Sequence, residues 1–511
     1  MNETATPAIT APAESNPVVV SAPELMSSAR LVRALQHLLE WVVGAIVIGS
    51  VLAIGSVHPP AYTALWVACF SAFGLTLLRA LAILALRERL GEHRVAFHVS
   101  GRWLVVEPPP DAAVRFVIDL RAKELPRPPL FLPGAAFLIL ALLQLVPLFG
   151  GPVTIDVDST NRGTTFVLAF VLLHSSAAAV FAHRPARQRF RRMLAWLGAL
   201  VAVIGLVQLA SGTRLIYGVF RPHEGDQPFG PFVDRNHFAG YMLLVVPIAL
   251  GLLADAWRRY AERTGDKANA RRRLVSLSSP AGTALLYAAL PPLLGIGALL
   301  ATNSRGGLLA FAGGLVMALL GTRSRRGTPG WAAALVFLAL ALAWFGLERM
   351  EVRFVRAGDE APGRTAVWQE AIGSLHGWRW ATGFGFDTFA QGVSRVSAWR
   401  LPKGATPWPP EAATALLGGQ RVGYRSPSGI AGIGWYRQAH NDWVQLLYEA
   451  GLVGLLIGVW AAAAVLAAAR LDPWLFAALA GVLVHALVDF DLQIPAVTAL
   501  FVVLAALPPR R

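Results

Sequence analysis

The sequence predicts an all-α polytopic membrane protein with about twelve transmembrane helices. Three observations support this fold class. Of the 511 residues, 55% are hydrophobic and only 15% are charged, against roughly 25% charged residues in an ordinary soluble protein. The mean hydropathy is +0.53, and apolar runs of about 20 residues, the length that crosses a bilayer, recur along the chain. The 48 Gly and 34 Pro are typical of transmembrane helices, which tolerate both residues. A water-soluble enzyme is therefore excluded.

The first quarter of the chain divides into three segments. Residues 1–34 are predicted to form a disordered cytoplasmic tail, because they lack the basic start, apolar core and cleavage site of a signal peptide. Two transmembrane helices follow within 35–86. Segment 87–128 is predicted to be a small cytoplasmic insertion with a β-hairpin, because its apolar and polar residues alternate. The single cysteine, Cys69, excludes an intrachain disulfide and a cysteine-based metal site.

The remaining helices fall into two groups. Helices 3–9 are predicted within 129–347 and helices 10–12 within 443–511, and a large loop at 348–442 separates helices 9 and 10. The last two helices are divided by Asp489 and Asp491, because charges at mid-bilayer are costly. The twelve candidate apolar runs lie near 35–57, 61–86, 129–149, 164–182, 193–211, 237–256, 283–302, 306–321, 331–347, 443–469, 474–489 and 495–508.

The orientation follows from the basic residues in the short linkers. Twelve helices place the basic segments on one side of the membrane, which is the cytoplasm by the positive-inside rule, with both termini inside. Most of the net charge of +15 then lies in cytoplasmic linkers and reflects the orientation in the membrane, so a nucleic-acid partner is excluded. The loop 348–442 lies on the opposite, outer side. The basic segments are 183–192 with five Arg, 257–273 with seven Lys and Arg, 322–327 with three Arg, and the terminal Arg pair.

Polar residues gather at the outer ends of three predicted helices. Arg235 and His237 stand at the entrance of the sixth helix, where Asp234 can cap the helix and the arginine can simply extend to the interface. Arg305 follows Thr302-Asn303-Ser304 between helices seven and eight. A capped helix N-terminus beside an arginine is a potential phosphate site, and a tight interhelical turn is the alternative.

Two glycines and a histidine complete this outer group. Gly306 and Gly307 allow another group to approach the backbone closely. His440 and Asn441 lie where the chain re-enters the membrane. A lone histidine there is more often structural, but beside two arginines that hold a diphosphate it becomes a candidate base, because imidazole titrates near neutral pH.

Five motifs occur in order among these helices: FVDRNHFAGY, NSRGG, GRTAVWQEAIGSL with GFGFDTF, AHNDWVQLLYEAGLVG, and LVDFDLQIPA. Together they resemble the O-antigen ligase and O-antigen polymerase superfamily of bacterial inner-membrane glycosyltransferases. The pattern of His-Asn, nine residues and Gly-x-x-Gly at 440–454 is similar to the ligase signature. The resemblance covers about residues 195–500, and it does not choose between ligases, polysaccharide polymerases and protein O-oligosaccharyltransferases, which share these motifs.

The resemblance implies an enzyme that moves a glycan from undecaprenyl diphosphate to an acceptor hydroxyl on the periplasmic face, without a metal or another cofactor. It implies that Arg235 and Arg305 hold the diphosphate and that His440 activates the acceptor. The acceptor is the lipid A core for a ligase and a growing lipid-linked glycan for a polymerase. Either enzyme serves the assembly of O-antigen or exopolysaccharide.

Further residues are predicted to support the site. Asn441, Gly306 and Gly307 belong to the motifs above. Arg364 either docks glycan or braces the outer loop, and His237 either helps to bind the donor or is interfacial. Asp489 is expected to pair with one of the arginines rather than with a metal, because two carboxylates, Asp489 and Asp491, are a thin shell for Mg²⁺.

Two other classes of protein compete with this interpretation. Some relatives of the superfamily are linked to bicarbonate uptake, but transporters usually place ionisable residues at the bilayer midplane in repeated halves. Here the charges gather at one face and no internal repeat is visible. A structural scaffold leaves the grouping of outer arginines and histidine unexplained. The sequence does not determine the sugar, the acceptor or the oligomeric state.

Overall fold

The protein is described by a computed structural model that covers most of the predicted helices. Two compact units are distinguished: residues 1–39 with 74–124, and residues 40–73 with 125–511. All candidate site residues belong to the second unit. The described residues are 22–91, 98–100, 103–106, 116–118, 128–148, 151–222, 227–265, 271, 275–321, 367–396, 406–408, 423–426, 429–431 and 437–507.

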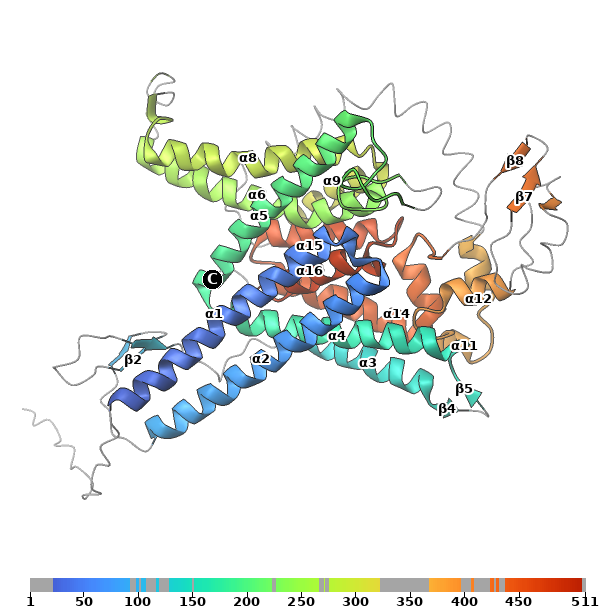
Figure 1. Ribbon diagram of the computed structural model, residues 1–511, viewed down its shortest axis with the longest axis horizontal. Coiled ribbons are helices and arrows are strands. Elements are labelled where there is room, and N and C mark those ends of the chain that lie inside the picture. Colours follow the sequence, from blue (N-terminus) through green and yellow to red (C-terminus); the bar gives the residue numbers. More distant parts are fainter. Residues whose placement is uncertain are drawn as a thin grey trace, which may run out of the picture. The chain divides into compact units, whose positions relative to one another are not determined.

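Long helices dominate the described residues and coincide with the predicted apolar runs (Figure 1). Seven are long and apolar enough to cross a membrane: α1 (Ala22–Leu52), α2 (Pro59–Gly91), α4 (Val157–Phe181), α5 (Arg184–Ser211), α6 (Arg235–Thr264), α8 (Pro280–Ala301) and α14 (Asp442–Ala469). Four apolar helices are shorter: α3 (Phe131–Leu145), α9 (Arg305–Gly321), α15 (Pro473–His485) and α16 (Pro495–Ala505). The predicted helical membrane fold is thereby confirmed.

The helix count and the orientation remain predictions. The run 331–347 lies outside the described residues. Helices α15 and α16 contain 13 and 11 residues, so at 1.5 Å per residue they are about 20 and 17 Å long, shorter than a bilayer core of about 30 Å. A 3₁₀ turn, η3 (Asp491–Gln493), separates them. Among the described residues, seven helices are therefore candidate membrane spans by length and composition, and α15 and α16 are not among them.

Short strands accompany the helices. Segment 87–128 contains a three-stranded antiparallel sheet of β1 (His98–Ser100), β2 (Trp103–Val106) and β3 (Phe116–Ile118). The outer loop, 348–442, contains a second such sheet, together with the helices 367–373, α11 (Arg379–Thr382) and α12 (Phe389–Val396). The other strands are β4 (Pro147–Leu148), β5 (Gly151–Pro152), β6 (Thr406–Trp408), β7 (Gly423–Ser426) and β8 (Gly429–Ala431).

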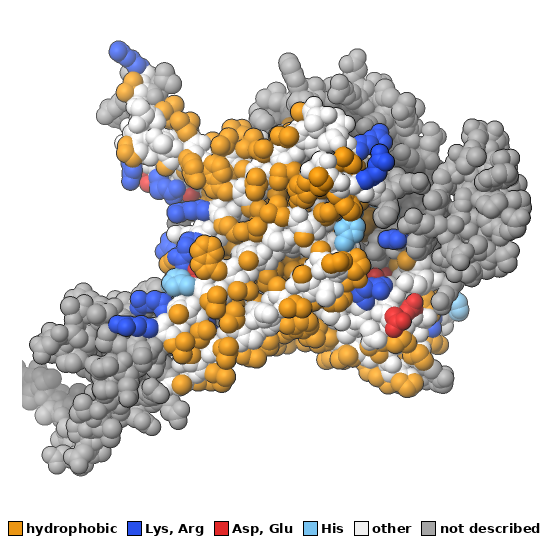
Figure 2. Space-filling model, in the orientation of Figure 1, with side chains coloured by type: hydrophobic (Ala, Val, Ile, Leu, Met, Phe, Trp, Pro, Cys, Tyr) orange, Lys and Arg blue, Asp and Glu red, His pale blue; other side chains and the backbone are white. Residues whose placement is uncertain are grey.

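Helix α6 is the central helix of the second unit. It is the most buried of the seven candidate spans, and it contacts α5, α8, α9, α15 and α16. The helices at the periphery of the bundle keep apolar side chains exposed, as expected of a surface that faces lipid. On α8 these include Leu286, Leu290 and Leu293. Figure 2 shows such side chains spread over the helices, with Lys and Arg gathered near one end of α6 and α8.

Helix α14 is broken at Gly451, a glycine of the 440–454 motif. Gly451 has φ +65° and ψ −168°, outside the helical region. The break frees two helix carbonyls, and they accept hydrogen bonds from the outer loop: Phe384 N donates to Tyr448 O at 3.0 Å and Gly385 N donates to Glu449 O at 2.9 Å. A side chain at Gly451 would overlap the Ala381 carbonyl of α11. The glycine therefore lets the outer loop dock on the backbone of α14.

Candidate functional site

The first turn of α6 carries Arg235 and His237. The Asp234 side chain accepts a hydrogen bond from Asn236 N at 2.6 Å and caps the helix. Capping fixes where the helix begins, so Arg235 becomes its first residue and is half-buried. His237 is buried. Its ring packs edge-on against Phe490, with 4.5 Å between ring centroids.

The first turn of α9 carries Arg305. Ser304 Oγ accepts a hydrogen bond from Gly307 N at 3.2 Å, so the polar residues ahead of the helix act as a cap, as the sequence predicts. Two glycines then allow close packing. A Cβ atom at Gly307 would lie 2.6 Å from Ala239 Cβ of α6, and one at Gly306 would lie 3.0 Å from His485 Nε2 of α15. The start of α9 is therefore held against both of these helices.

The first turn of α14 follows His440. Asn441 is its N-cap, and Asn441 Oδ1 accepts from Trp443 N at 3.0 Å and from Val444 N at 3.1 Å. Its amide group donates to Leu487 O at 2.8 Å, which ties the start of α14 to the turn after α15. Asn441 is thus structural. His440 itself has φ +51°, a left-handed conformation that is costly for a residue with a side chain.

A histidine–aspartate cluster (His237, His440, His485, Asp489 and Asp491) joins these helix ends. Asp489 Oδ1 lies 3.6 Å from His440 Nδ1 and 3.8 Å from His237 Nε2. The ring of Phe490 packs edge-on against His440, with centroids 4.7 Å apart. The His440 side chain is 26% exposed and that of Asp489 only 3%. The His440 ring is therefore partly accessible, whereas the Asp489 carboxyl group beside it is buried.

Neighbouring histidines lower the pKa of Asp489 in spite of its burial. Burial alone would raise its pKa, but pairing with His440 and the field of the other two histidines lower the pKa below the ordinary value for aspartate. The sequence pattern predicts an arginine partner for this carboxyl group. Its described ion pairs are instead with His237 and His440, because the turn after α15 folds back onto the starts of α6 and α14.

Two members of the cluster were not recognised as a pair from the sequence. His485 Nδ1 lies 2.5 Å from Asp491 Oδ2, and both side chains are fully buried. A histidine inside the apolar run of α15 was a usable signal, because ionisable groups in membrane segments are functional candidates. Its partner depends on a turn that the sequence does not reveal. Asp491 also packs against the bare backbone of Gly240.

The remaining predicted residues are placed as follows. Arg364 lies outside the described residues. Its neighbour Trp368 does brace the outer loop, because Trp368 Nε1 donates to Ala439 O at 2.6 Å. Among the residues that the structure describes, no group of three or more His, Cys, Asp or Glu has a metal-binding arrangement.

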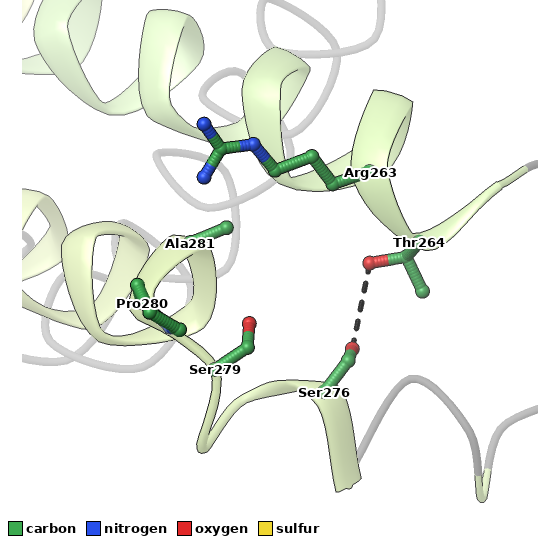
Figure 3. A pocket seen from close by; sticks show the side chains of 6 residues that line it. All are labelled: Arg263, Thr264, Ser276, Ser279, Pro280 and Ala281. Carbon is green, nitrogen blue, oxygen red and sulfur yellow. Dashed lines mark hydrogen bonds between the residues drawn. The ribbon is translucent and has the colours of Figure 1, made fainter.

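A cavity of about 250 Å³ lies elsewhere, between the end of α6 and the start of α8 (Figure 3). Arg263, Thr264, Ser276 and Ser279 line it, and Thr264 and Ser276 are hydrogen-bonded across it at 3.4 Å. Arg263 is 28 residues beyond Arg235, which corresponds to about 42 Å of helix. The cavity is therefore separate from the histidine–aspartate cluster.

Residues 291–413 match the O-antigen ligase family. The match covers 123 of the 511 residues. This match supports the resemblance of the five motifs to the O-antigen ligase and polymerase superfamily. No curated protein matches the chain.

The matched segment includes part of the candidate site. It contains Arg305, Gly306 and Gly307, whereas Arg235 and His440 lie outside it. The apolar helices indicate a multi-pass membrane protein, and the matched segment is similar to O-antigen ligases, which are glycosyltransferases.

Proposed function

We propose that this protein transfers a glycan from undecaprenyl diphosphate to an acceptor hydroxyl at the periplasmic face of the inner membrane. One observation carries the proposal. The helices that begin with Arg235 and Arg305 contact each other through Ala239 and Gly307, and Asp489 links the first of them to His440. Two arginines at adjoining helix starts and a carboxylate-paired histidine are the groups that such a transfer needs.

The arginines and helix ends are proposed to bind the donor diphosphate. Arg235 and Arg305 are the first residues of α6 and α9, where free backbone N–H groups and the helix dipole favour anions. A guanidinium group can hold two phosphate oxygens at once. These groups would stabilise the negative charge that grows on the bridging oxygen as the glycosidic bond breaks. The proposal requires no metal.

His440 is proposed to act as the general base. Its Nδ1 faces Asp489, so a neutral imidazole with its proton on Nδ1 presents the lone pair of Nε2 to the substrate side. The acceptor oxygen attacks the anomeric carbon, its proton passes to Nε2, and the bond from that carbon to the diphosphate oxygen breaks. Undecaprenyl diphosphate then leaves as an anion, so little help from a general acid is needed.

Arginine-to-lysine substitutions test the diphosphate site. Lysine keeps the charge but loses the planar fork of guanidinium, so we expect Arg235→Lys and Arg305→Lys each to lower kcat/KM by about tenfold or more, as loss of one charge-assisted hydrogen bond does. The measurement is the release of undecaprenyl diphosphate from the natural lipid-linked glycan by purified protein in nanodiscs. Arg214→Lys, at an exposed arginine before α6, is the control. Full activity of both site variants would show that neither guanidinium group needs to hold two phosphate oxygens of the donor.

A deletion strain distinguishes the two proposed acceptors. If single repeat units accumulate on the lipid carrier, the protein is a polymerase. If long polymers accumulate without attachment to lipid A core, it is a ligase. Protein O-oligosaccharyltransfer would instead appear as loss of glycan from periplasmic proteins.

A further inference from the structure

The peptide groups next to His440 are held on both sides. Ala439 N donates a hydrogen bond to Gln445 Oε1 at 3.1 Å, and Ala439 O accepts one from Trp368 Nε1 at 2.6 Å. His440 follows with φ +51°. A residue with a side chain persists in this region only where its surroundings impose it. The two hydrogen bonds to Ala439 are therefore part of what fixes the direction of the His440 ring.

Gln445 is itself fixed by its surroundings. It is fully buried, and its amide nitrogen donates to Glu449 Oε1 at 3.0 Å and to Gln438 Oε1. With both amide hydrogens directed at oxygen atoms, the amide oxygen is left to accept from Ala439 N. The orientation of Gln445 therefore depends on Glu449.

Glu449 connects this arrangement to the outer loop. Its carboxylate is buried and accepts from Asp387 N at 3.0 Å and from Phe389 N at 3.2 Å. Both donors belong to the outer-loop segment that docks on the broken helix α14. Hydrogen bonds thus run without interruption from the outer loop through Glu449 and Gln445 to the turn that carries His440.

We propose that Gln445 and Glu449 are positioning residues, which make the alignment of His440 depend on docking of the outer loop on α14. The proposal rests on the proposed role of His440 as the base. It explains why an amide and a carboxyl side chain are buried one turn apart near the start of α14, which is apolar beyond Glu449. The loop is then needed for the chemical step.

The test compares Gln445→Ala with His174→Ala. His174 is an equally buried polar side chain that is hydrogen-bonded to Val502 O at 2.8 Å and to Leu130 N at 3.2 Å, and it has no described contact with the His440 turn or with the docked loop. We expect Gln445→Ala to lower kcat by about a hundredfold, as a misplacement of about 1 Å does, with KM for the natural undecaprenyl diphosphate-linked glycan unchanged. His174→Ala should lower the melting temperature similarly but change kcat less than threefold.

Combination with His440→Ala separates positioning from a general structural effect. If Gln445 acts through His440, adding Gln445→Ala to His440→Ala lowers the residual rate no further. A further drop, or equal rates for Gln445→Ala and His174→Ala, would overturn the positioning role while the proposed function stands. If His440→Ala keeps full activity, the proposed function itself fails, and this inference fails with it.

A second variant covers the case in which Gln445→Ala does not fold. Trp368→Phe keeps an aromatic ring but loses the donor to Ala439 O. We expect it to lower kcat in the same direction at unchanged KM. Wild-type kcat in folded Trp368→Phe would contradict the proposal.

Discussion

Replacing His440 by alanine is expected to lower the rate of glycan transfer by about 10²–10⁴-fold, the usual contribution of a positioned general base. The donor should still bind, because the proposed diphosphate groups, Arg235 and Arg305, stand on other helices. The acceptor hydroxyl would then have to lose its proton to water during attack. The measurement is initial release of undecaprenyl diphosphate at saturating lipid-linked glycan, together with the affinity for that donor.

The control for this prediction is His376→Ala. His376 is an exposed histidine of the same outer loop and has no described contact with the cluster, so its replacement should leave the rate unchanged. Equal rates for His440→Ala and wild type would remove His440 from the mechanism. A loss of donor binding equal to the loss of rate would show that His440 binds the donor instead.

Replacing Asp472 by alanine is expected to lower the free energy of unfolding by about 3–5 kcal/mol, the cost of breaking a buried ion pair. Asp472 Oδ2 lies 2.5 Å from an Arg191 guanidinium nitrogen, and both side chains are buried. The substitution leaves the arginine charge without its carboxylate in a low-dielectric site. It also removes the N-cap of α15, where Asp472 Oδ1 accepts from Leu475 N at 3.3 Å.

A more exposed pair is the control. Arg258 pairs with Asp255 three residues earlier on α6, and their side chains are 47% and 22% exposed, so Arg258→Ala should cost about 1 kcal/mol or less. Titration of the purified proteins with denaturing detergent gives both values. A cost below about 1 kcal/mol for Asp472→Ala would show that water reaches the Arg191 site.

The helices were largely predictable from the sequence because hydropathy and capping act locally. The run 237–256 corresponds to α6, which continues to Thr264 because its basic end remains helical beyond the apolar stretch. The first helix was predicted to reach residue 57, but it ends at Leu52, and Gly55 follows at φ +65°. Such boundaries depend on packing, and here Gly55 lies against Phe232.

The candidate site was predictable in its parts but not in its pairings. Arg235, Arg305 and His440 stand at helix starts as expected. The partners of the buried charges depend on contacts between distant segments, which no local pattern records. Asp472 accepts a hydrogen bond from the Arg191 side chain, 281 positions away in the sequence. Glu449 accepts one from the backbone N–H of Asp387, 62 positions away. Asp489 likewise reaches two histidines rather than an arginine only because the turn after α15 folds inward.

The most direct test of the central claim is a structure of the protein with its undecaprenyl diphosphate-linked glycan, determined by electron cryo-microscopy in nanodiscs. We expect the diphosphate to lie between the starts of α6 and α9, in contact with Arg235 and Arg305, with the anomeric carbon facing His440. A diphosphate bound elsewhere, such as in the cavity beside Arg263 at the other end of α6, would contradict this claim.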